Sequence, residues 1–413
     1  MIDINSALKQ ILEQIPILGK ERISILSALG RVLAEDIAAP RHIPPWNNSA
    51  MDGYAVKWAD IKGAAPDKPV ILRVIADLPA GQIFNGRVGE KEAVRIMTGA
   101  PIPEGADTVV PVEDTEKAGE AVKILQETPP GKNIRLAGED VKQGEEILSS
   151  GTILQPAHIG MLASCQRAFV YVYQKPRVAI LSTGDELIEI DEPWTEGKIV
   201  NSNAYSIASQ VKMCAAEPII LGIAQDRLED LLNKIQQGLL ADILITSGGV
   251  SVGDYDLVKD MLRKLGEINF WKVAMRPGQP LAFGLVSGKP LFGLPGNPVS
   301  SMVSFEQFVR PAILKMAGHT KIFRPTILAE LGEDLEKKAG LTHFLRCRLL
   351  RENDKIIATT TGEQGSGILS SMVKAQGLIV LPAELTKARP GQKVKVMLLD
   401  QTFFSDTVPN YLS

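Results

Sequence analysis

An apolar run that ends in a glycine and two acids, RVAILSTGDEL at residues 177–187, decides the fold of the middle of this chain. Two more apolar runs follow, EPIILGIA at 217–224 and DILITSGG at 242–249, and amphipathic segments separate the three. Buried strands that alternate with amphipathic helices are typical of a parallel sheet covered on both faces. A hairpin around residues 287–289 and a helix over 298–317 complete the pattern. We therefore predict an α/β domain whose first helices span residues 202–215, 226–239 and 255–265.

The chain on either side of this domain has a different texture. Helical spacing of apolar residues predicts helices over residues 2–38 and 156–167. Short apolar runs separated by Gly and Pro predict all-β modules over residues 69–154 and 323–413. The second of these modules fits a small barrel or sandwich.

The composition excludes several classes of protein. The chain has 413 residues, of which 45% are apolar and 23% charged, as in ordinary globular proteins. Its 45 Lys and Arg nearly balance 48 Asp and Glu, so no overall field attracts nucleic acid or an anionic membrane, and an anionic ligand needs a local site. Three distant cysteines and four histidines without metal-ligand spacing argue against a zinc site. Charged residues within the first apolar segment exclude a signal peptide or a membrane span, so we expect a cytoplasmic protein.

Acids and glycines follow each predicted strand of the α/β domain. Glu186 follows the first strand and Asp226 the second. The third strand is followed by a glycine-rich loop with four further candidates, Gly248, Gly249, Ser251 and Asp256. Because ligands of an open parallel sheet bind at the carboxyl ends of its strands, these groups share one edge. Each acid alone fits a helix cap, but the set together favours a ligand site. The glycine amides would face an anion, and the absence of a G-x-x-x-x-G-K-[ST] loop excludes a P-loop nucleotidase.

A second anion motif is LPGNPVSS at residues 294–301. Asn297 suits the N-cap of a helix and Pro298 its first position, so the amides of the next three residues would point outward at the positive end of the helix dipole. A well-capped helix without a ligand explains the motif equally well. Nearby, FWKVAMRPGQP supplies two cations, Lys272 and Arg276, which taken alone fit a solvated face.

A third motif, PPWNNSAMDGYAV at residues 44–56, begins as a cluster of turn residues and continues as a strand. It places Asp52 between Met51 and Gly53. A bare turn needs no acid, and a glycine lets another backbone or a ligand come close. Asp52 is therefore a candidate functional group.

Six stretches, in this order along the chain, resemble one family: PPWNNSAMDGYAV, IMTGAPIPEGADTVV, RLAGEDV, LSTGDEL, TSGGVSVGDYD and GLPGNPVSS. The chain is similar to the molybdopterin molybdenumtransferases, the MoeA and gephyrin E-domain family. The resemblance implies an elongated homodimer of four-domain subunits. The domains would be a helical linking domain (1–43 and 141–175), an inserted β domain (44–140), a MogA-like molybdopterin-binding α/β domain with a parallel-rich sheet (176–322) and a C-terminal small β barrel (323–413).

The resemblance also implies an activity, the insertion of molybdate into adenylylated molybdopterin with Mg²⁺ and release of AMP. Molybdate is a tetrahedral dianion and needs amides, hydroxyls and cations, whereas a pyrophosphate being cleaved needs Mg²⁺ held by carboxylates and by the phosphates themselves. The implied partners are adenylylated molybdopterin, molybdate, a second subunit, a MogA-type adenylyltransferase and apo-molybdoenzymes.

Matching the family motifs and the strand ends to this chain gives the candidate site. We predict catalytic roles for Asp52, Glu186, Asp226, Asp256, Lys272 and Arg276, with Asp226 and Asp256 as the Mg²⁺ ligands. We predict substrate binding by Thr98, Arg135, Gly248, Gly249, Ser251, Asn297, Pro298, Ser300, Ser301 and Ser371. Asp52 would face the α/β domain of the other subunit. The chain departs from the family pattern KPGKP at Arg276 and Gln279, so the sequence leaves open which cation holds the oxyanion.

Two alternative functions remain open at this point. MogA-type adenylyltransferases share the α/β core, but they are single short domains with GGTG where this chain has residues 248–251, GGVS. A peptide-binding scaffold like the gephyrin E-domain would be expected with an attached second domain and a long linker. The sequence does not decide between molybdate and tungstate.

Overall fold

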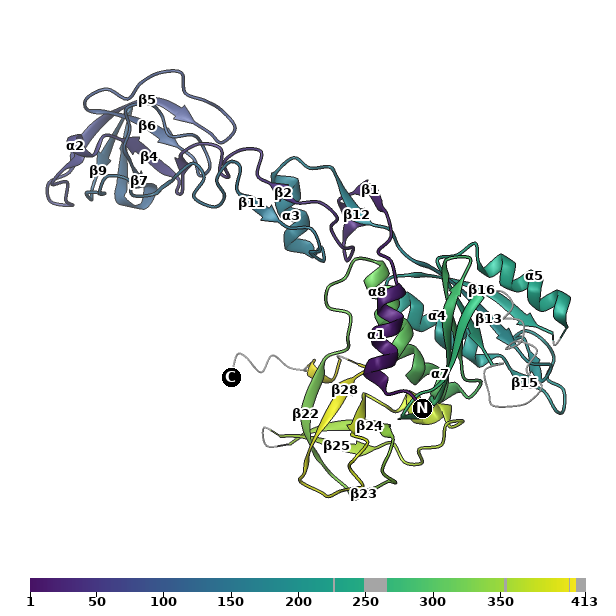
Figure 1. The fold of residues 1–413 in the computed structure, drawn as a ribbon. Coiled ribbons are helices and arrows are strands. Elements are labelled where there is room, and N and C mark those ends of the chain that lie inside the picture. Colours follow the sequence, from purple (N-terminus) through teal and green to yellow (C-terminus); the bar gives the residue numbers. More distant parts are fainter. Residues whose placement is uncertain (226, 249–265, 353–354, 401, 406–413) are drawn as a thin grey trace. The chain divides into compact units, whose positions relative to one another are not determined.

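The computed structural model describes residues 1–225, 227–248, 266–352, 355–400 and 402–405. The chain divides into two compact units (Figure 1). The first unit comprises Met1–Arg22, Gly30–Ala34 and Tyr171–Ser413, and the second comprises Ile23–Leu29 and Glu35–Val170. Within the described ranges, no helix is both long and apolar enough to span a bilayer. The four-domain boundaries predicted from the sequence stay a proposal.

A six-stranded sheet forms the centre of the first unit, in the order β16-β13-β17-β21-β20-β18. Its strands are β13 (Arg177–Thr183), β16 (Glu217–Ala224), β17 (Ile243–Ser247), β18 (Gly266–Lys272), β20 (Pro280–Val286) and β21 (Lys289–Leu294). The first four strands in this order run parallel, and β20 and β18 are antiparallel to their neighbours. The predicted hairpin turns at Ser287 and Gly288, which both have positive φ, as a two-residue turn requires. The parallel-rich α/β domain is thereby confirmed.

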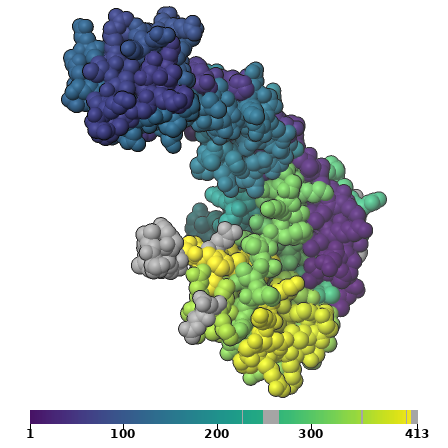
Figure 2. Space-filling view, turned by 90° about the vertical axis from the view of Figure 1, so that its left-hand side faces the viewer, coloured from purple at the N-terminus to yellow at the C-terminus, as the bar shows by residue number. Residues whose placement is uncertain are grey.

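Helices cover both faces of this sheet. They are α1 (Ile4–Gln14), α4 (Ser202–Met213), α5 (Leu228–Gly238), α7 (Pro298–Ser304) and α8 (Arg310–Met316), and a π-helical turn, Phe305–Val309, joins α7 to α8. Leu231 of α5 packs with Leu244 on one face, whereas α1, α4, α7 and α8 share a larger core with Ile180 and Ile245 on the other. Figure 2 shows the purple N-terminal residues against the green α8 region. The helices predicted at 202–215, 226–239 and 298–317 are confirmed in their described parts, and the one at 255–265 lies outside the described residues.

The C-terminal part of the first unit is a small barrel, as predicted. Its strands are β22 (Thr326–Leu331), β24 (Thr342–Glu352), β25 (Lys355–Thr360), β26 (Gly377–Leu381) and β28 (Lys393–Leu398), and the pairing of β24 with β26 closes the ring. β23 (Leu335–Glu336) pairs with β27 (Lys387–Ala388), and α9 spans Leu369–Val373. The short β19 (Met275–Arg276) leaves the α/β domain and pairs with β24, so it carries Arg276 to the barrel.

The second unit contains the β module predicted from the short apolar runs. A six-stranded sheet has the order β7-β4-β6-β5-β9-β8. Its strands are β4 (Gly53–Val56), β5 (Val70–Leu78), β6 (Glu92–Ile96), β7 (Thr108–Pro111), β8 (Thr115–Ala118) and β9 (Ala121–Ile124). β3 (Asn48–Ser49) pairs with β10 (Ile134–Arg135), and β2 (Ile37–Ala38) pairs with β11 (Glu146–Leu148). The helices are α2 (Trp58–Ile61) and α3 (Pro156–Ser164), the latter within the predicted helix at 156–167.

The helix predicted over residues 2–38 is wrong beyond α1. After Gln14 the chain forms β1 (Lys20–Ser24) and a 3₁₀ turn (Leu26–Ala28). Pro16 cannot continue a helix, because its nitrogen carries no hydrogen to donate. Farther along, the Tyr173 amide donates to the Val32 carbonyl, so the extended backbone there is satisfied by a distant segment of the same unit. Tertiary pairing thus overrides the apolar spacing that suggested a second helix.

Candidate active site

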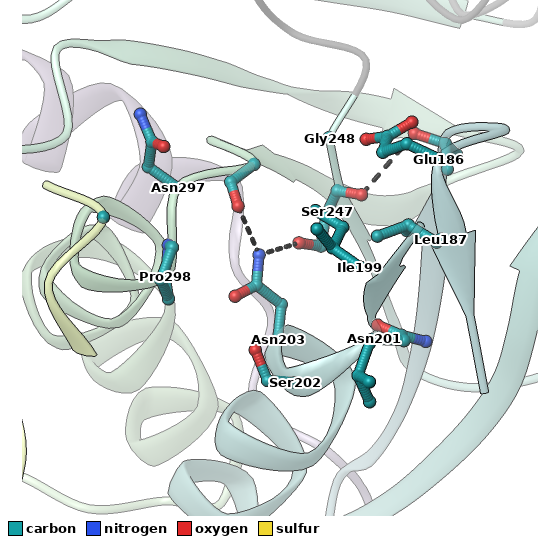
Figure 3. Close-up of a pocket in the computed structure, with 14 residues that line it drawn as sticks. Glu186, Leu187, Ile199, Asn201, Ser202, Asn203, Ser247, Gly248, Asn297 and Pro298 are labelled. Carbon is teal, nitrogen blue, oxygen red and sulfur yellow. Dashed lines mark hydrogen bonds between the residues drawn. The ribbon is translucent and has the colours of Figure 1, made fainter. Parts of the chain in front are cut away.

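A pocket of about 540 Å³ lies at the carboxyl ends of β13 and β17 (Figure 3). We call it the rim pocket. It is lined by Thr183, Glu186, Leu187, Ile199, Val200, Asn201, Ser202, Asn203, Ser247, Gly248, Gly296, Asn297, Pro298 and Gly367. Four of the predicted site residues therefore share one cavity, namely Glu186, Gly248, Asn297 and Pro298.

Two asparagines at the start of α4 organise the rim pocket. The Asn203 amide donates to the Ser247 hydroxyl at 2.9 Å and to the Gly296 carbonyl at 2.7 Å, and both contacts are drawn in Figure 3. Asn201 accepts a hydrogen bond from the buried Ser182 hydroxyl at 2.8 Å. Sequence reasoning missed both residues. The available signal was the polar run NSN directly before an amphipathic helix, which places two side-chain amides near the strand ends.

Gly248 serves the backbone of the sheet. Its amide donates to the Leu294 carbonyl at 3.1 Å, so the expectation that this amide faces an anion is wrong. Its φ is +95°, and a Cβ on it would lie 2.7 Å from the Thr183 carbonyl oxygen. Glycine is required there because a neighbouring strand end comes close. Four other candidates from the strand ends, Asp226, Gly249, Ser251 and Asp256, lie outside the described residues.

The predicted cradle of three free amides at PGNPVSS is also wrong. The Val299 amide donates to the Ser366 carbonyl at 3.1 Å, and the Ser301 amide makes the first helical bond to the Asn297 carbonyl. Asn297 stands at the N-cap position, but its side chain makes no capping hydrogen bond. Ser300 and Ser301 are buried, and the Ser301 hydroxyl has no hydrogen-bond partner among the described residues. That the hydroxyls of Ser300 and Ser301 bind substrate stays a prediction.

A second cavity, of about 860 Å³, opens beside the barrel. We call it the barrel pocket. Its cationic and imidazole side chains are those of Arg276, Lys337, Lys338, His343 and Arg346, and its acids are Glu336 and Glu363. Lysine and arginine thus outnumber carboxylates, which favours an anionic ligand. Of the two predicted cations, Arg276 lines this pocket, whereas Lys272 is exposed at the end of β18 and lines neither pocket.

Arg346 of β24 is the residue that sequence reasoning missed here. It is fully buried, its Nε donates to the Ser371 hydroxyl at 3.0 Å, and its Nη2 donates to the Gly365 carbonyl at 3.0 Å. Its Nη1 has no hydrogen-bond partner within the described ranges. Burial lowers the pKa of Arg346 to about 10, so the guanidinium stays charged at neutral pH. A buried charge with a free donor is costly unless something binds it. The strand THFLRCRLL offered no signal for its burial, because Arg346 alternates with Leu345, Cys347 and Leu349, which pack in the barrel core.

The pKa of His343, which lines the barrel pocket, is affected by burial and by the neighbouring cations. Burial, with the nearby charges of Lys337 and Arg276, lowers the pKa of His343 from 6.5 to about 4. Burial also lowers the pKa of Lys337, whose ammonium donates to the carbonyls of Leu341 and Ala383. His343 is therefore neutral at pH 7, and the pocket charge rises if the pH falls far enough to protonate it.

Stability should consequently depend on pH through His343. His343 is protonated near pH 6.5 in the unfolded chain but only near pH 4 in the folded chain. The free energy of unfolding therefore decreases as the pH falls through that window. Urea unfolding of the wild type and of His343→Gln at about pH 7 and about pH 5 measures the effect. The wild type should lose more stability than the variant on acidification. Equal losses in the two proteins would contradict the assignment.

In the second unit, the structure brings two predicted residues together. The amide and the hydroxyl of Thr98 both donate to Oδ1 of Asp52, each at 2.7 Å. These two bonds lower the pKa of Asp52, which is exposed and therefore ionised at neutral pH. Arg135 lies on β10, paired with Asn48 in the same motif as Asp52. Gly53 is explained by the backbone, since a Cβ there would lie 1.9 Å from the Val110 carbonyl oxygen.

The chain is similar to known proteins along nearly its whole length. Three family profiles match the chain: the MoeA N-terminal region (domain I and II) at residues 2–165, a probable molybdopterin binding domain at 179–315, and the MoeA C-terminal region (domain IV) at 329–399. The molybdopterin molybdenumtransferase of Haemophilus influenzae is 38% identical over 401 residues, which covers 96% of this chain and 98% of that protein. This chain belongs to the MoeA family. The molybdopterin molybdenumtransferase of a Nostoc species, 39% identical over 92% of this chain and 88% of its own, agrees.

A solved MoeA structure extends the agreement to the fold. The molybdopterin biosynthesis MoeA protein of Pyrococcus horikoshii superposes with a TM-score of 0.85 at 30% identity and covers 96% of this chain and 99% of its own. The predicted family, the multidomain architecture and the class of enzyme, a transferase of molybdenum cofactor biosynthesis, are confirmed by these relatives. MoeA relatives that match over nearly the whole chain also favour the transferase over the single-domain alternative.

The predicted Mg²⁺ ligands of this MoeA chain are Asp226 and Asp256, both outside the described residues. Among the residues that the structure does describe, no three His, Cys, Asp or Glu side chains gather as a metal site. Glu186, a further predicted catalytic acid, is exposed on the rim pocket.

Proposed function

We propose that this protein inserts molybdate into adenylylated molybdopterin, with Mg²⁺ and release of AMP, and that the barrel pocket holds the oxyanion. The second part rests on the buried Arg346, whose Nη1 has no hydrogen-bond partner among the described residues. Arg346 lines a cavity together with Arg276 and two lysines. A tetrahedral dianion offers the charge and the acceptors that such a donor lacks.

Arg346 and Arg276 would bind the oxyanion from two different strands. Arg346 is fixed by Ser371 and Gly365, so its remaining donors have a set direction. Arg276 reaches the same pocket from β19. Ser371 itself donates to the Ile368 carbonyl at 2.7 Å, so its hydroxyl orients Arg346 more than it binds the ligand. The proposal thus assigns the oxyanion to arginine side chains, a choice that the sequence leaves open at Arg276 and Gln279.

The rim pocket would take the organic part of the substrate. It offers side-chain amides and hydroxyls from Asn201, Asn203 and Ser247, together with apolar surface from Leu187 and Ile199. A fused heterocycle with amide-like edges fits such a lining, because its faces are apolar and its edges pair with amides. We assign Mg²⁺ to Asp226 and Asp256, where it would neutralise the phosphates at the bond that is cleaved.

The function is tested by measuring AMP release from adenylylated molybdopterin. Release should require both molybdate and Mg²⁺, and the product should restore an apo-molybdoenzyme. In the complementary assay, ATP and molybdopterin should give no adenylylated product. Formation of that product, with no AMP release from the adenylylated substrate, would favour an adenylyltransferase instead.

We further propose a cytoplasmic homodimer in which Asp52 completes the site of the partner subunit. Asp52→Ala should lower turnover by about a hundredfold, as expected for loss of a carboxylate at a reacting centre. Mixing Asp52→Ala with Arg346→Met subunits should then restore about a quarter of wild-type activity, because half of the dimers are mixed and each has one intact site.

Thermal melts should show both single variants folded, and subunit exchange should be verified with tagged chains before activity is read. Absence of recovery after complete exchange would mean that Asp52 and Arg346 act within one chain. A MogA-type adenylyltransferase that supplies the substrate and apo-molybdoenzymes that accept the product are the proposed partners.

A further inference from the structure

The segment Gly362–Gly367, between β25 and α9, lies between the two pockets. Gly365 lines the barrel pocket and Gly367 lines the rim pocket. Its Gly365 carbonyl holds Nη2 of Arg346, and its Ser366 carbonyl accepts the Val299 amide at the start of α7. The position of this short segment therefore sets the direction of the buried guanidinium.

One side chain fixes the segment to β24. Oε1 of Gln364 accepts the Arg346 amide at 2.9 Å, and its Nε2 donates to the Arg346 carbonyl at 3.3 Å and to the Gly362 carbonyl at 2.9 Å. Gly362 has a φ of +100°, so the turn that these bonds close needs a glycine. Gln364 thus binds the backbone of Arg346, and the neighbouring Gly365 binds the side chain of Arg346.

We propose that Gln364 is a positioning residue for the oxyanion, acting through Arg346, an inference that rests on the proposed function of the barrel pocket. Without Gln364, the Gly365 carbonyl is free to shift and Nη2 loses its fixed acceptor. Arg346 then samples other directions, and the dianion must order it on binding. The expected defect is in molybdate affinity, whereas the reaction of a saturated site is unchanged.

The test compares two glutamines that each accept a backbone amide of β24. Gln364→Ala should raise the KM for molybdate in AMP release about tenfold, the factor that corresponds to one or two hydrogen bonds, with kcat unchanged. The matched control is Gln376→Ala, since Oε1 of Gln376 accepts the Leu349 amide of β24 at 2.8 Å and Gln376 lines neither pocket. Each variant removes the side-chain acceptor of a β24 amide, but Gln376→Ala should leave the KM for molybdate unchanged.

Arg346→Met, measured in parallel, distinguishes a failure of the positioning role of Gln364 from a failure of the proposed oxyanion site in the barrel pocket. If Arg346→Met weakens molybdate binding and Gln364→Ala does not, the positioning role is wrong and the oxyanion pocket stands. If Arg346→Met binds molybdate normally, the proposed pocket is wrong and the role of Gln364 is overturned with it. A loss of kcat at constant KM in Gln364→Ala, matched by Gln376→Ala, would mean that Gln364 only stabilises the barrel.

Discussion

Replacing Arg346 by methionine is expected to weaken molybdate binding by at least about a hundredfold, because a buried charge and its directed donors are lost together. Methionine is close to arginine in length up to the guanidinium, so the strand can still pack. Isothermal titration with molybdate and with tungstate measures the effect. Both oxyanions have the same charge and shape, so both should lose affinity.

The matched control is Arg348→Met, two residues along β24 on the same face of the strand, where the side chain is exposed. It removes the same charge from the same strand but leaves the barrel pocket intact, so it should bind molybdate like the wild type. Thermal melts without ligand should show that both variants are folded. Equal affinity in Arg346→Met and Arg348→Met would place the oxyanion elsewhere.

The second large effect concerns the stability of the first unit. Glu306 is buried in the π-helical turn and accepts Nε of Arg324 at 2.9 Å, Nη2 of Arg324 at 3.2 Å and Nε2 of Gln210 at 2.9 Å. Arg310 approaches the same carboxylate at 3.8 Å. Glu306→Gln leaves both arginines partly buried without their counter-charge, so we expect a loss of about 3–5 kcal/mol in unfolding free energy.

Urea unfolding followed by tryptophan fluorescence measures this loss. Glu336→Gln is the control, because Glu336 pairs with Lys387 at 2.8 Å while both side chains are about two-thirds exposed, at 70% and 67%. Such an exposed pair contributes less than about 1 kcal/mol. If Glu306→Gln is no less stable than Glu336→Gln, the buried cluster does not hold the helices together.

The parts of the fold that depend on local pattern were predictable. A strand was predictable in the run at 177–187 because residues 178–181 are continuously apolar, as in a strand that is buried on both faces. The second helix expected within 2–38 failed, since Pro16 ends α1 and the backbone beyond is paired with residues distant in sequence. Apolar spacing alone carries no information about such partners.

The site residues that depend on local pattern were likewise predictable, and those that depend on distant contacts were not. Strand ends and helix starts pointed to Glu186, Asn297 and Pro298, which do share the rim pocket. The free amides at PGNPVSS failed because the Val299 amide is taken by Ser366, a residue of another segment. Arg346 was missed for a related reason, since its burial depends on contacts made by Gly365 and Ser371 after the barrel has formed.

Reconstitution of an apo-molybdoenzyme tests the central claim most directly. The mixture contains this protein, adenylylated molybdopterin, Mg²⁺ and molybdate at a concentration that saturates the wild type. We expect the wild type and Arg348→Met to restore enzyme activity and Arg346→Met to restore almost none. Restoration by Arg346→Met at the wild-type rate, or none by the wild type itself, would contradict molybdate insertion through the barrel pocket.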